Sequence, residues 1–229
     1  MKSNYLILLI AVFSFSLFAN ENSKPDAPVA VLMKIIKDVS FKKGSTNWGS
    51  AKLGTPLSTN DEVKTGDKSL ALIKFTDNSI IRVRENSSLK IYADKNNNQL
   101  SKNTYIDKGK VGFNVSKQEN EEFRFTTPTM VASIRGTEGY IGVGDDGFSL
   151  LVCIEGSIDV SGTVGQKESG KVVAGTYAII GSTGTIQQGT ATVQMQNENT
   201  NSKKSNIKRL IIKSSQGDLI IEYLAGENE

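Results

Sequence analysis

The chain of 229 residues contains no histidine. Histidine is the side chain that changes charge most readily near neutral pH, and it is the commonest metal ligand in proteins. Its absence excludes histidine-based acid–base catalysis and both Ser–His and Cys–His nucleophile pairs. Most hydrolase mechanisms are excluded with them, and we expect a protein that is not an enzyme and that uses no cofactor.

Pairs of carboxylates can catalyse reactions without histidine, as they do in glycosidases. Five acids lie in or beside predicted turns and could form such a pair: Glu121, Glu122, Asp145, Asp146 and Glu155. Acids are also the usual residues of solvated turns and strand edges. We interpret these five as surface groups. The alternative, an enzyme that acts on a wall polymer, requires two of them to face each other in a cleft.

Cysteine is almost absent, because Cys153 is the only one in the chain. A chain with one cysteine has no internal disulfide. Its neighbours Leu151, Val152 and Ile154 are apolar, which is typical of a buried strand. Burial raises the pKa of a thiol and suppresses the thiolate, so we interpret Cys153 as a small core residue rather than a reactive thiol.

Long apolar runs are missing except near the N-terminus, where Tyr5 to Phe18 is nearly all apolar after Lys2. This run of about 14 residues is shorter than the roughly 20 that span a bilayer. Ala19 supplies the small residue expected before a cleavage site. We predict that residues 1–19 are a signal peptide, with an uncleaved anchor as the alternative. No cysteine is available there for lipid attachment, so we expect a periplasmic or cell-envelope protein without an integral span after cleavage.

A strong excess of charge is missing as well, because the formal net charge is only +3. Removing residues 1–19 takes away one lysine and no acid, which leaves 26 of the 27 basic residues against 24 acidic ones. The densest basic cluster, Lys203-Lys204 with Lys208-Arg209, lies in a polar stretch. Nucleic-acid binding requires a concentrated basic stripe, so we predict no nucleic-acid partner.

The residues that the chain does use are typical of β-structure, with Val, Ile, Thr, Gly and Ser throughout. Short apolar segments separated by turn residues predict strands at Val29–Ile36, Glu62–Thr65, Leu70–Phe75, Ile80–Val83, Leu89–Tyr92, Lys110–Val115, Phe123–Thr126, Met130–Ile134, Tyr140–Val143, Phe148–Ile154, Ile158–Val160, Val172–Val173 and Tyr177–Ile180. Alternation places Ala71, Ile73 and Phe75 on one face, with Ile73 and Phe75 predicted to face the core. We predict an all-β fold with many short strands, wound as a β-roll or irregular solenoid-like sandwich.

Several stretches rich in Gly, Asn and Asp are interpreted as turns. Residues 76–79 and 144–147 have the composition of hairpin connections. Residues 94–98 resemble the start of a calcium loop, but Gln99 and Tyr105 stand where such a loop needs glycine and a bidentate glutamate. The glycines of residues 139–147 do not have dinucleotide-binding spacing. No metal site and no cofactor site is predicted.

Polar segments flank a predicted domain of residues 29–180. Residues 20–28 hold two prolines and are interpreted as a flexible tether. Residues 181–206 are rich in Gly, Ser, Thr, Gln and Asn, which favours a linker or loosely packed loop. Residues 207–229 contain two apolar runs around a turn and predict a terminal hairpin with a tail. An isolated hairpin is marginal in water, so this one should dock on the body or on a partner.

A series of blocks over residues 29–180 resembles the FecR domain family in order and spacing. The blocks are Trp48–Leu57, Asp61–Gly66, Ser69–Phe75 with Asp77–Ser79, Arg82–Ser87, Lys108–Val111, Thr126–Thr129, Val131–Thr137, Glu155–Val160 and Ala174-Gly175. The resemblance implies an all-β extracytoplasmic domain, which in the founding iron-citrate regulator passes a signal from an outer-membrane receptor to a sigma factor. That regulator has a cytoplasmic anti-sigma segment before its apolar stretch. This chain lacks one, so we do not expect it to control a sigma factor directly.

The block Arg135-Gly136-Thr137 supplies the candidate site residues, Arg135 and Thr137. A regular strand would place Arg135 on one face with Val131 and Ser133. An arginine is costly to bury alone, so we expect it to bind a carboxylate or loop carbonyl groups. We interpret the block as a structural clamp, with a partner contact as the alternative.

These observations predict a non-enzymatic FecR-like envelope protein that acts as a binding or scaffold module for an envelope protein or a cell-wall polymer. The alternative is a periplasmic sensor component of a FecR-type signal-transduction system that works with a separate membrane partner. Both follow from the family resemblance and from the missing catalytic residues.

Overall fold

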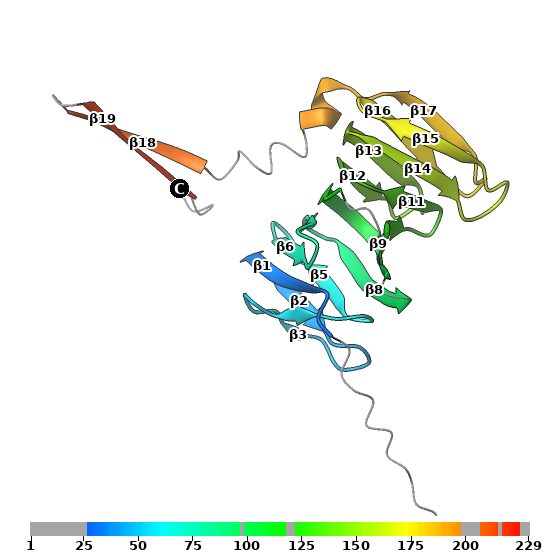
Figure 1. Cartoon of the computed structure of the whole chain (residues 1–229), viewed down its shortest axis with the longest axis horizontal. Coiled ribbons are helices and arrows are strands. Elements are labelled where there is room, and N and C mark those ends of the chain that lie inside the picture. Colours follow the sequence, from blue (N-terminus) through cyan, green and yellow to red (C-terminus); the bar gives the residue numbers. More distant parts are fainter. Residues whose placement is uncertain (1–26, 97–98, 118–121, 198–206, 215–216, 225–229) are drawn as a thin grey trace, which may run out of the picture.

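The computed structural model describes residues 27–96, 99–117, 122–197, 207–214 and 217–224 (Figure 1). This part of the chain is nearly all β-strand, with one helical turn at residues 193–197. The predicted signal peptide, residues 1–19, lies outside the described residues. Within the described ranges, no helix is long and apolar enough to cross a membrane.

Two sheets face each other and share the long strand β9 (Gln99–Val115). Sheet A has the order β4 (Pro56–Leu57), β1 (Ala30–Ile36), β6 (Leu70–Phe75), β7 (Ile80–Val83), the second half of β9, β12 (Thr137–Val143), β13 (Ser149–Glu155), β16 (Thr176–Ile180) and β17 (Ile186–Thr190). Sheet B has the order β3 (Gly49–Ser50), β2 (Val39–Lys42), β5 (Glu62–Thr65), β8 (Ser88–Asn96), the first half of β9, β10 (Glu122–Thr126), β11 (Met130–Ile134), β14 (Ser157–Gly162) and β15 (Ser169–Val173).

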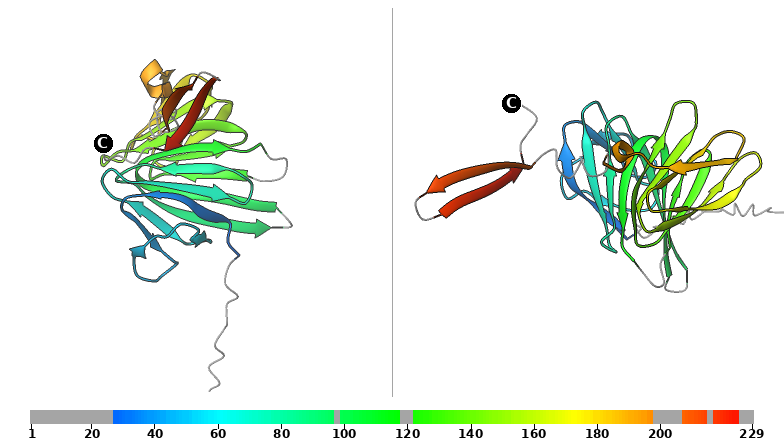
Figure 2. Two further views of the ribbon diagram at one scale, coloured as in Figure 1. Left: turned by 90° about the vertical axis from the view of Figure 1, so that its left-hand side faces the viewer. Right: turned by 90° about the horizontal axis from the view of Figure 1, so that it is seen from above.

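The chain winds from one sheet to the other as a ribbon of hairpins (Figure 2). From β10 onward the hairpins fall alternately in sheet B and sheet A: β10–β11, β12–β13, β14–β15 and β16–β17. Between successive hairpins of one sheet, β11 pairs with β14 and β13 pairs with β16. This winding confirms the predicted all-β roll.

Strand β9 crosses from sheet B to sheet A along its 17 residues. Gly109 stands at the crossing with a φ of 92°, and a Cβ there would lie 2.2 Å from Ser87 Oγ. Only glycine fits both the backbone conformation and the space. The sequence predicted only the second half of this strand, Lys110–Val115, because core-facing positions of the first half are polar, namely Lys102 and Thr104.

The core lies between the sheets, and the residues predicted from alternation point into it. Ala71, Ile73 and Phe75 of β6 are all buried. The Phe75 ring meets the Phe123 ring edge-on, with centroids 4.9 Å apart. The rings of Phe123 and Phe125 lie 5.2 Å apart. The Phe75–Phe123 contact joins sheet A to sheet B, and aromatic pairs in such geometry stabilise a core beyond their buried area.

Several strands have no clear sequence signal. Strands β3 and β4 have two residues each, and β2 is short as well. Strand β17 falls inside residues 181–206, the segment predicted as a linker or loop, because Gln187, Gln188 and Gly189 hide its β character. The predicted terminal hairpin is present: β18 (Ile207–Ser214) pairs with β19 (Gly217–Leu224) in a separate sheet.

A candidate binding groove on the outer face of sheet A

The predicted clamp residues Arg135 and Thr137 lie at the turn between β11 and β12. Strand β11 ends at Ile134, so Arg135 stands outside the strand and is exposed. The burial expected for Arg135 is therefore not found, because the chain turns directly afterwards at Gly136, with a φ of 59°. Thr137 is buried, and its Oγ1 lies 3.0 Å from the Arg135 carbonyl oxygen and 3.2 Å from that of Ser157. Thr137 ties the turn to β14, whereas the role of Arg135 stays a prediction.

The described acids considered for carboxylate catalysis are spread over the molecule. Asp145 and Asp146 lie on the turn before β13, and Glu155 ends that strand. A strand of 7 residues separates them, which corresponds to about 20 Å. Glu122 lies on β10 in the other sheet, and Glu121 lies outside the described residues. Asp145 and Asp146 therefore share one turn, whereas Glu155 and Glu122 lie on other parts of the two sheets.

Cys153 is fully buried in β13, as the sequence predicted. Its Sγ lies 3.5 Å from the Gly156 carbonyl oxygen. Burial raises the pKa of the thiol to about 11, so the thiolate is scarce at neutral pH. Among the described residues, no group of three or more His, Cys, Asp or Glu side chains could hold a metal ion.

One ion pair lies inside the sandwich and was missed by sequence reasoning. Lys102 Nζ on β9 lies 2.5 Å from Asp77 Oδ2 on the β6–β7 turn, and both side chains are almost completely buried. Asp77 Oδ1 also accepts a hydrogen bond of 2.8 Å from the Ser79 amide. The pair joins the two sheets and is closed to solvent, so we assign it to the structure and not to ligand binding.

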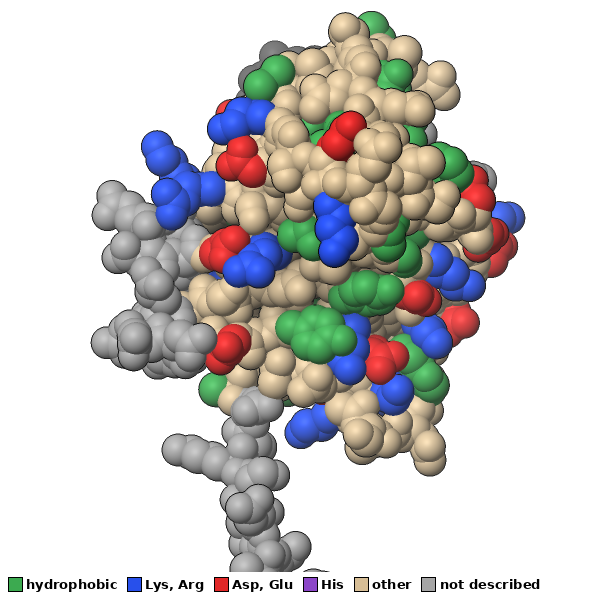
Figure 3. All heavy atoms as spheres, turned by 90° about the vertical axis from the view of Figure 1, so that its right-hand side faces the viewer, with side chains coloured by type: hydrophobic (Ala, Val, Ile, Leu, Met, Phe, Trp, Pro, Cys, Tyr) green, Lys and Arg blue, Asp and Glu red, His purple; other side chains and the backbone are tan. Residues whose placement is uncertain are grey.

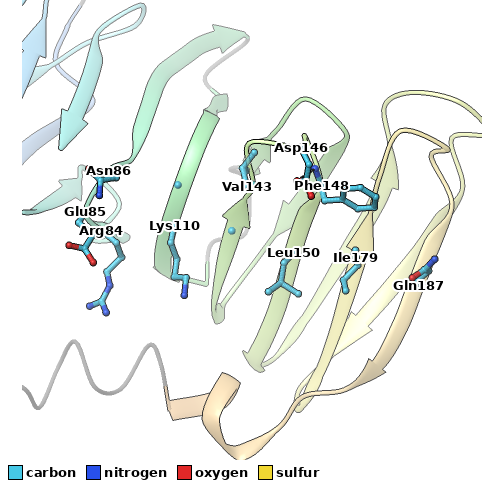
Figure 4. Close-up of a pocket in the computed structure, with 13 residues that line it drawn as sticks. Arg84, Glu85, Asn86, Lys110, Val143, Asp146, Phe148, Leu150, Ile179 and Gln187 are labelled. Atoms are coloured by element: carbon cyan, nitrogen blue, oxygen red, sulfur yellow. Dashed lines mark hydrogen bonds between the residues drawn. The ribbon is translucent and has the colours of Figure 1, made fainter. Parts of the chain in front are cut away.

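A groove of about 840 Å³ lies on the outer face of sheet A (Figure 4). One residue from each of six neighbouring strand segments contributes to a single row across it, in register from strand to strand. The row runs Arg84, Lys110, Gly142, Leu150, Ile179 and Gln187. Segments separated by about a hundred residues of sequence are brought side by side only by the sheet pairing.

The groove has an apolar middle and a charged end. Leu150 and Ile179 form its floor, and Phe148, which is 47% exposed, stands beside them. A Cβ added to Gly142 would meet nothing within 4 Å, so this glycine leaves the floor open. Figure 4 shows Arg84 and Lys110 projecting at the same end of the row, where Glu85 also lines the groove beside Arg84. Such a surface can hold an apolar side chain and a carboxylate together.

A second arginine lies in the next row of the same face. Arg82 pairs in register with Gly112, which in turn is opposite Tyr140. The Arg82 side chain is only 9% exposed, and its Nη1 has no hydrogen-bond partner in the described part of the chain. Burial lowers the pKa of Arg82, an effect that the charge of Glu138 opposes. A buried guanidinium with a free donor adds to the basic character of this end of the face.

The same face is partly covered by the chain itself. Residues 191–197 follow β17 and cross the outer side of sheet A, where Ala191 packs with Tyr140 and Val152. Leu150 belongs both to this small apolar cluster and to the groove. The groove is therefore the uncovered continuation of a face that the chain already covers in part.

The side of the molecule in Figure 3 differs from the groove. Basic and acidic side chains, drawn blue and red, are interspersed on it, and its apolar side chains are scattered. Trp48 is the largest exposed aromatic side chain of the N-terminal strands, and Lys64 Nζ lies 4.2 Å from its ring centroid. Exposed ion pairs such as Arg124–Glu122 and Lys171–Asp159 lie on sheet B. No single-sign charge patch is visible on this face.

The structure is a β-roll domain whose outer sheet A face carries an apolar groove with charged side chains at one end. Residues 61–159 match the family described as FecR protein. The chain therefore carries a FecR domain, which spans β5 to the middle of β14. No curated protein matches the chain.

Two solved structures have a similar fold. A putative anti-sigma factor from Parabacteroides distasonis is 12% identical, with a TM-score of 0.52 over 66% of this chain and 68% of that chain. A second crystal structure of a putative anti-sigma factor from the same organism is 11% identical, with a TM-score of 0.49 over 72% of this chain and 99% of that chain. At this level of identity, the first likeness shows the fold alone.

Proposed function

We propose that this protein is an exported, non-enzymatic binding module of the cell envelope that holds a protein partner in the groove of sheet A. The carrying observation is the row from Arg84 to Gln187, which presents an apolar floor beside a basic end. Exposed apolar surface of this kind on a soluble domain marks an interaction site. A peptide segment with an apolar side chain next to an acid matches both parts of the row.

A protein partner suits the groove better than a wall polymer. Leu150 and Ile179 offer no hydrogen-bonding group on their side chains, whereas a glycan presents many hydroxyl groups that need partners. Arg84 and Lys110 match a carboxylate, which peptides supply in aspartate and glutamate side chains. A scaffold role on wall polymer remains the competing form of this proposal.

A signal-transduction role is the second candidate, and the match of residues 61–159 to the FecR family favours it. In that case the groove partner is a membrane protein of a FecR-type system, and this domain is its periplasmic sensor component. The absence of histidine and the spread of the described acids support a regulatory rather than a catalytic role.

The test is partner capture with matched charge reversals. Arg84→Glu reverses a charge at the groove, and Lys90→Glu reverses one on strand β8 of sheet B. Wild type and both variants are cross-linked in envelope extracts, and each captured protein is quantified by mass spectrometry. We expect a protein whose capture falls about tenfold or more with Arg84→Glu, the loss that goes with a charge-assisted contact, and is unchanged with Lys90→Glu.

Capture that responds equally to both reversals, or to neither, would overturn the proposal. Co-sedimentation of the same variants with purified peptidoglycan distinguishes a protein partner from a scaffold role on the wall polymer. Binding to peptidoglycan that is lost only in Arg84→Glu would replace the protein partner by a wall polymer.

A further inference from the structure

Arg82 is buried on the outer face of sheet A although one of its donors is unsatisfied. Its neighbours Ile81 and Val83 face the core, so alternation directs Arg82 outward. The side chain is nevertheless only 9% exposed, and Nη1 has no hydrogen-bond partner in the described part of the chain. A guanidinium that loses water without gaining an acceptor destabilises the folded state. An arginine in such a place indicates a role other than folding.

The acids near Arg82 and the groove have hydrogen-bond donors other than Arg82 Nη1. Glu138 is the acid whose charge acts on Arg82, but burial, which lowers the pKa of Arg82, is the larger influence. The Glu138 carboxylate accepts a hydrogen bond of 3.0 Å from Asn114 Nδ2. Glu85, which lines the groove, accepts one of 2.8 Å from the Lys68 backbone amide. Nη1 of Arg82 therefore needs an acceptor from outside these residues.

Arg82 begins a row of residues that is parallel to the groove row and two positions away on each strand. This row runs Arg82, Gly112, Tyr140, Val152 and Tyr177. Like the groove row, it has a cation at one end and apolar residues in the middle. Lys110 of the groove row leans toward it, because Lys110 Nζ lies 5.4 Å from the Tyr140 ring centroid. The cations of the two rows therefore gather at one end of the face.

We propose that Arg82 recognises the acid of the groove partner, a peptide segment in which an aspartate or glutamate lies beside an apolar side chain. The apolar side chain packs on Leu150 and Ile179, and the carboxylate accepts a hydrogen bond from Arg82 Nη1. Arg82 and Arg84 are two residues apart on one strand, about 7 Å along it. An extended arginine side chain covers that distance. Since Nη1 is closed to solvent in this structure, the guanidinium turns toward the groove when the peptide binds, a side-chain change that is common at interfaces.

The unsatisfied donor makes Arg82 a residue that determines specificity. An apolar segment without an acid closes over the groove and leaves the guanidinium unpaired, which penalises that partner. A carboxylate pairs with the guanidinium and can accept two parallel N–H bonds from its planar fork. A lysine cannot reproduce this geometry. The inference rests on the proposed function, and it adds the chemical class of the partner segment and the residue that selects it.

Thermal unfolding tests the unsatisfied state of Arg82 without any partner. Arg82→Met keeps an unbranched apolar stem and removes the charge, and Arg124→Met is the matched control on the exposed face of sheet B. We expect the midpoint of Arg82→Met to equal or exceed that of the wild type, because a buried charge with an unsatisfied donor is lost. Arg124→Met should stay within about 2 °C. A midpoint of Arg82→Met clearly below that of the control would show that Arg82 stabilises the fold, and it would overturn the proposal.

Peptide selection tests the recognition itself. The immobilised wild-type protein selects binders from a phage-displayed library of random peptides, and groove binders are those whose capture is lost in Phe148→Ser. We expect these peptides to carry an acid beside an apolar residue. The affinity of one such peptide is then compared with that of the same peptide in which the amide replaces the acid. Wild type and Arg124→Met should prefer the acid about tenfold or more, the gain of a charge-assisted hydrogen bond.

Arg82→Met should bind the acid peptide and the amide peptide equally, and Arg82→Lys should recover only part of the preference. Groove binders without an acid, or an acid preference that survives in Arg82→Met, would overturn the role of Arg82 and leave the binding module standing. A library that yields no Phe148-dependent peptide gives a different result. In that case the groove does not bind peptides, and the proposed function fails together with the inference.

Discussion

The two sheets bury similar inner faces but carry different outer faces. The outside of sheet B is charged and partly self-paired, as in Arg124–Glu122 and Lys171–Asp159. The outside of sheet A carries an apolar cluster on β12, β13 and β16, and residues 191–197 cover only part of it. The outer face of sheet B is thus suited to contact with water, whereas the apolar part of the outer face of sheet A needs a packing partner. This difference is the reason why we propose the outer face of sheet A, and not that of sheet B, as the binding surface.

The largest loss of stability is expected when the buried ion pair between Lys102 on sheet B and Asp77 is broken. Lys102→Ala leaves Asp77 buried without its partner, and the free energy of unfolding should fall by about 3–5 kcal/mol. On the outer face of the same sheet, Lys171→Ala removes half of an exposed pair and should cost about 0–1 kcal/mol. Urea unfolding of both variants measures the two values. Similar losses would show that burial does not separate the two faces.

A second comparison sets the covered part of sheet A against sheet B. Tyr140 is 3% exposed beneath Ala191, and Tyr92 is 37% exposed on β8. Tyr140→Ala should destabilise the protein by about 3 kcal/mol, close to the loss seen for buried aromatic residues. Tyr92→Ala should stay within about 0.5 kcal/mol. Thermal unfolding of the two variants measures this difference. Equal midpoint temperatures would show that residues 191–197 do not bury Tyr140.

The Thr137 clamp is expected to have an intermediate effect. Thr137→Val removes the hydroxyl that lies against two backbone carbonyl groups and should lower stability by about 1–3 kcal/mol. Because Arg135 is exposed, Arg135→Ala should change stability by less than about 1 kcal/mol. Denaturant midpoints of the two variants test this order. A larger loss for Arg135 would restore the clamp role that the sequence suggested for it.

The smallest effect concerns Cys153 on the inner face of β13. Its pKa is about 11 in the folded protein, raised from 9.0 by burial. Below the unfolded pKa both states are protonated, so stability is unaffected. As pH rises above the unfolded value, the unfolded thiol ionises first and stability declines until the folded pKa is reached. Cys153→Ala should cost about 1 kcal/mol near pH 7 and remove part of this alkaline decline, which unfolding curves from pH 8 to pH 11 would reveal.

Local pattern was sufficient for much of the fold. The alternation in Leu70–Phe75 identified the buried face, and the turn at residues 76–79 joins β6 to β7 as composition indicated. The same reasoning failed for β17 and for the first half of β9, where polar side chains occupy strand positions. Sheet pairing stabilises these segments, and pairing is not a local property of sequence.

Local sequence patterns could not predict the groove either, because it too depends on sheet pairing. Arg84, Gly142 and Ile179 carry no shared motif, and they become neighbours only through the register of β9, β12, β13 and β16. Sequence reasoning instead selected Arg135, which belongs to a conspicuous block but lies in an exposed turn. The free Nη1 of Arg82 likewise emerges only from packing.

We propose that the outer face of sheet A binds a partner and that the outer face of sheet B does not. Phe148→Ser and Tyr92→Ser test it most directly, because both remove an exposed aromatic ring, one in the groove and one on sheet B. The measurement is the yield of each cross-linked partner from envelope extracts, beside thermal unfolding to show that both variants fold. We expect Phe148→Ser to lose a partner that Tyr92→Ser retains. Retention of every partner by Phe148→Ser, or loss of the same partner in both variants, would contradict it.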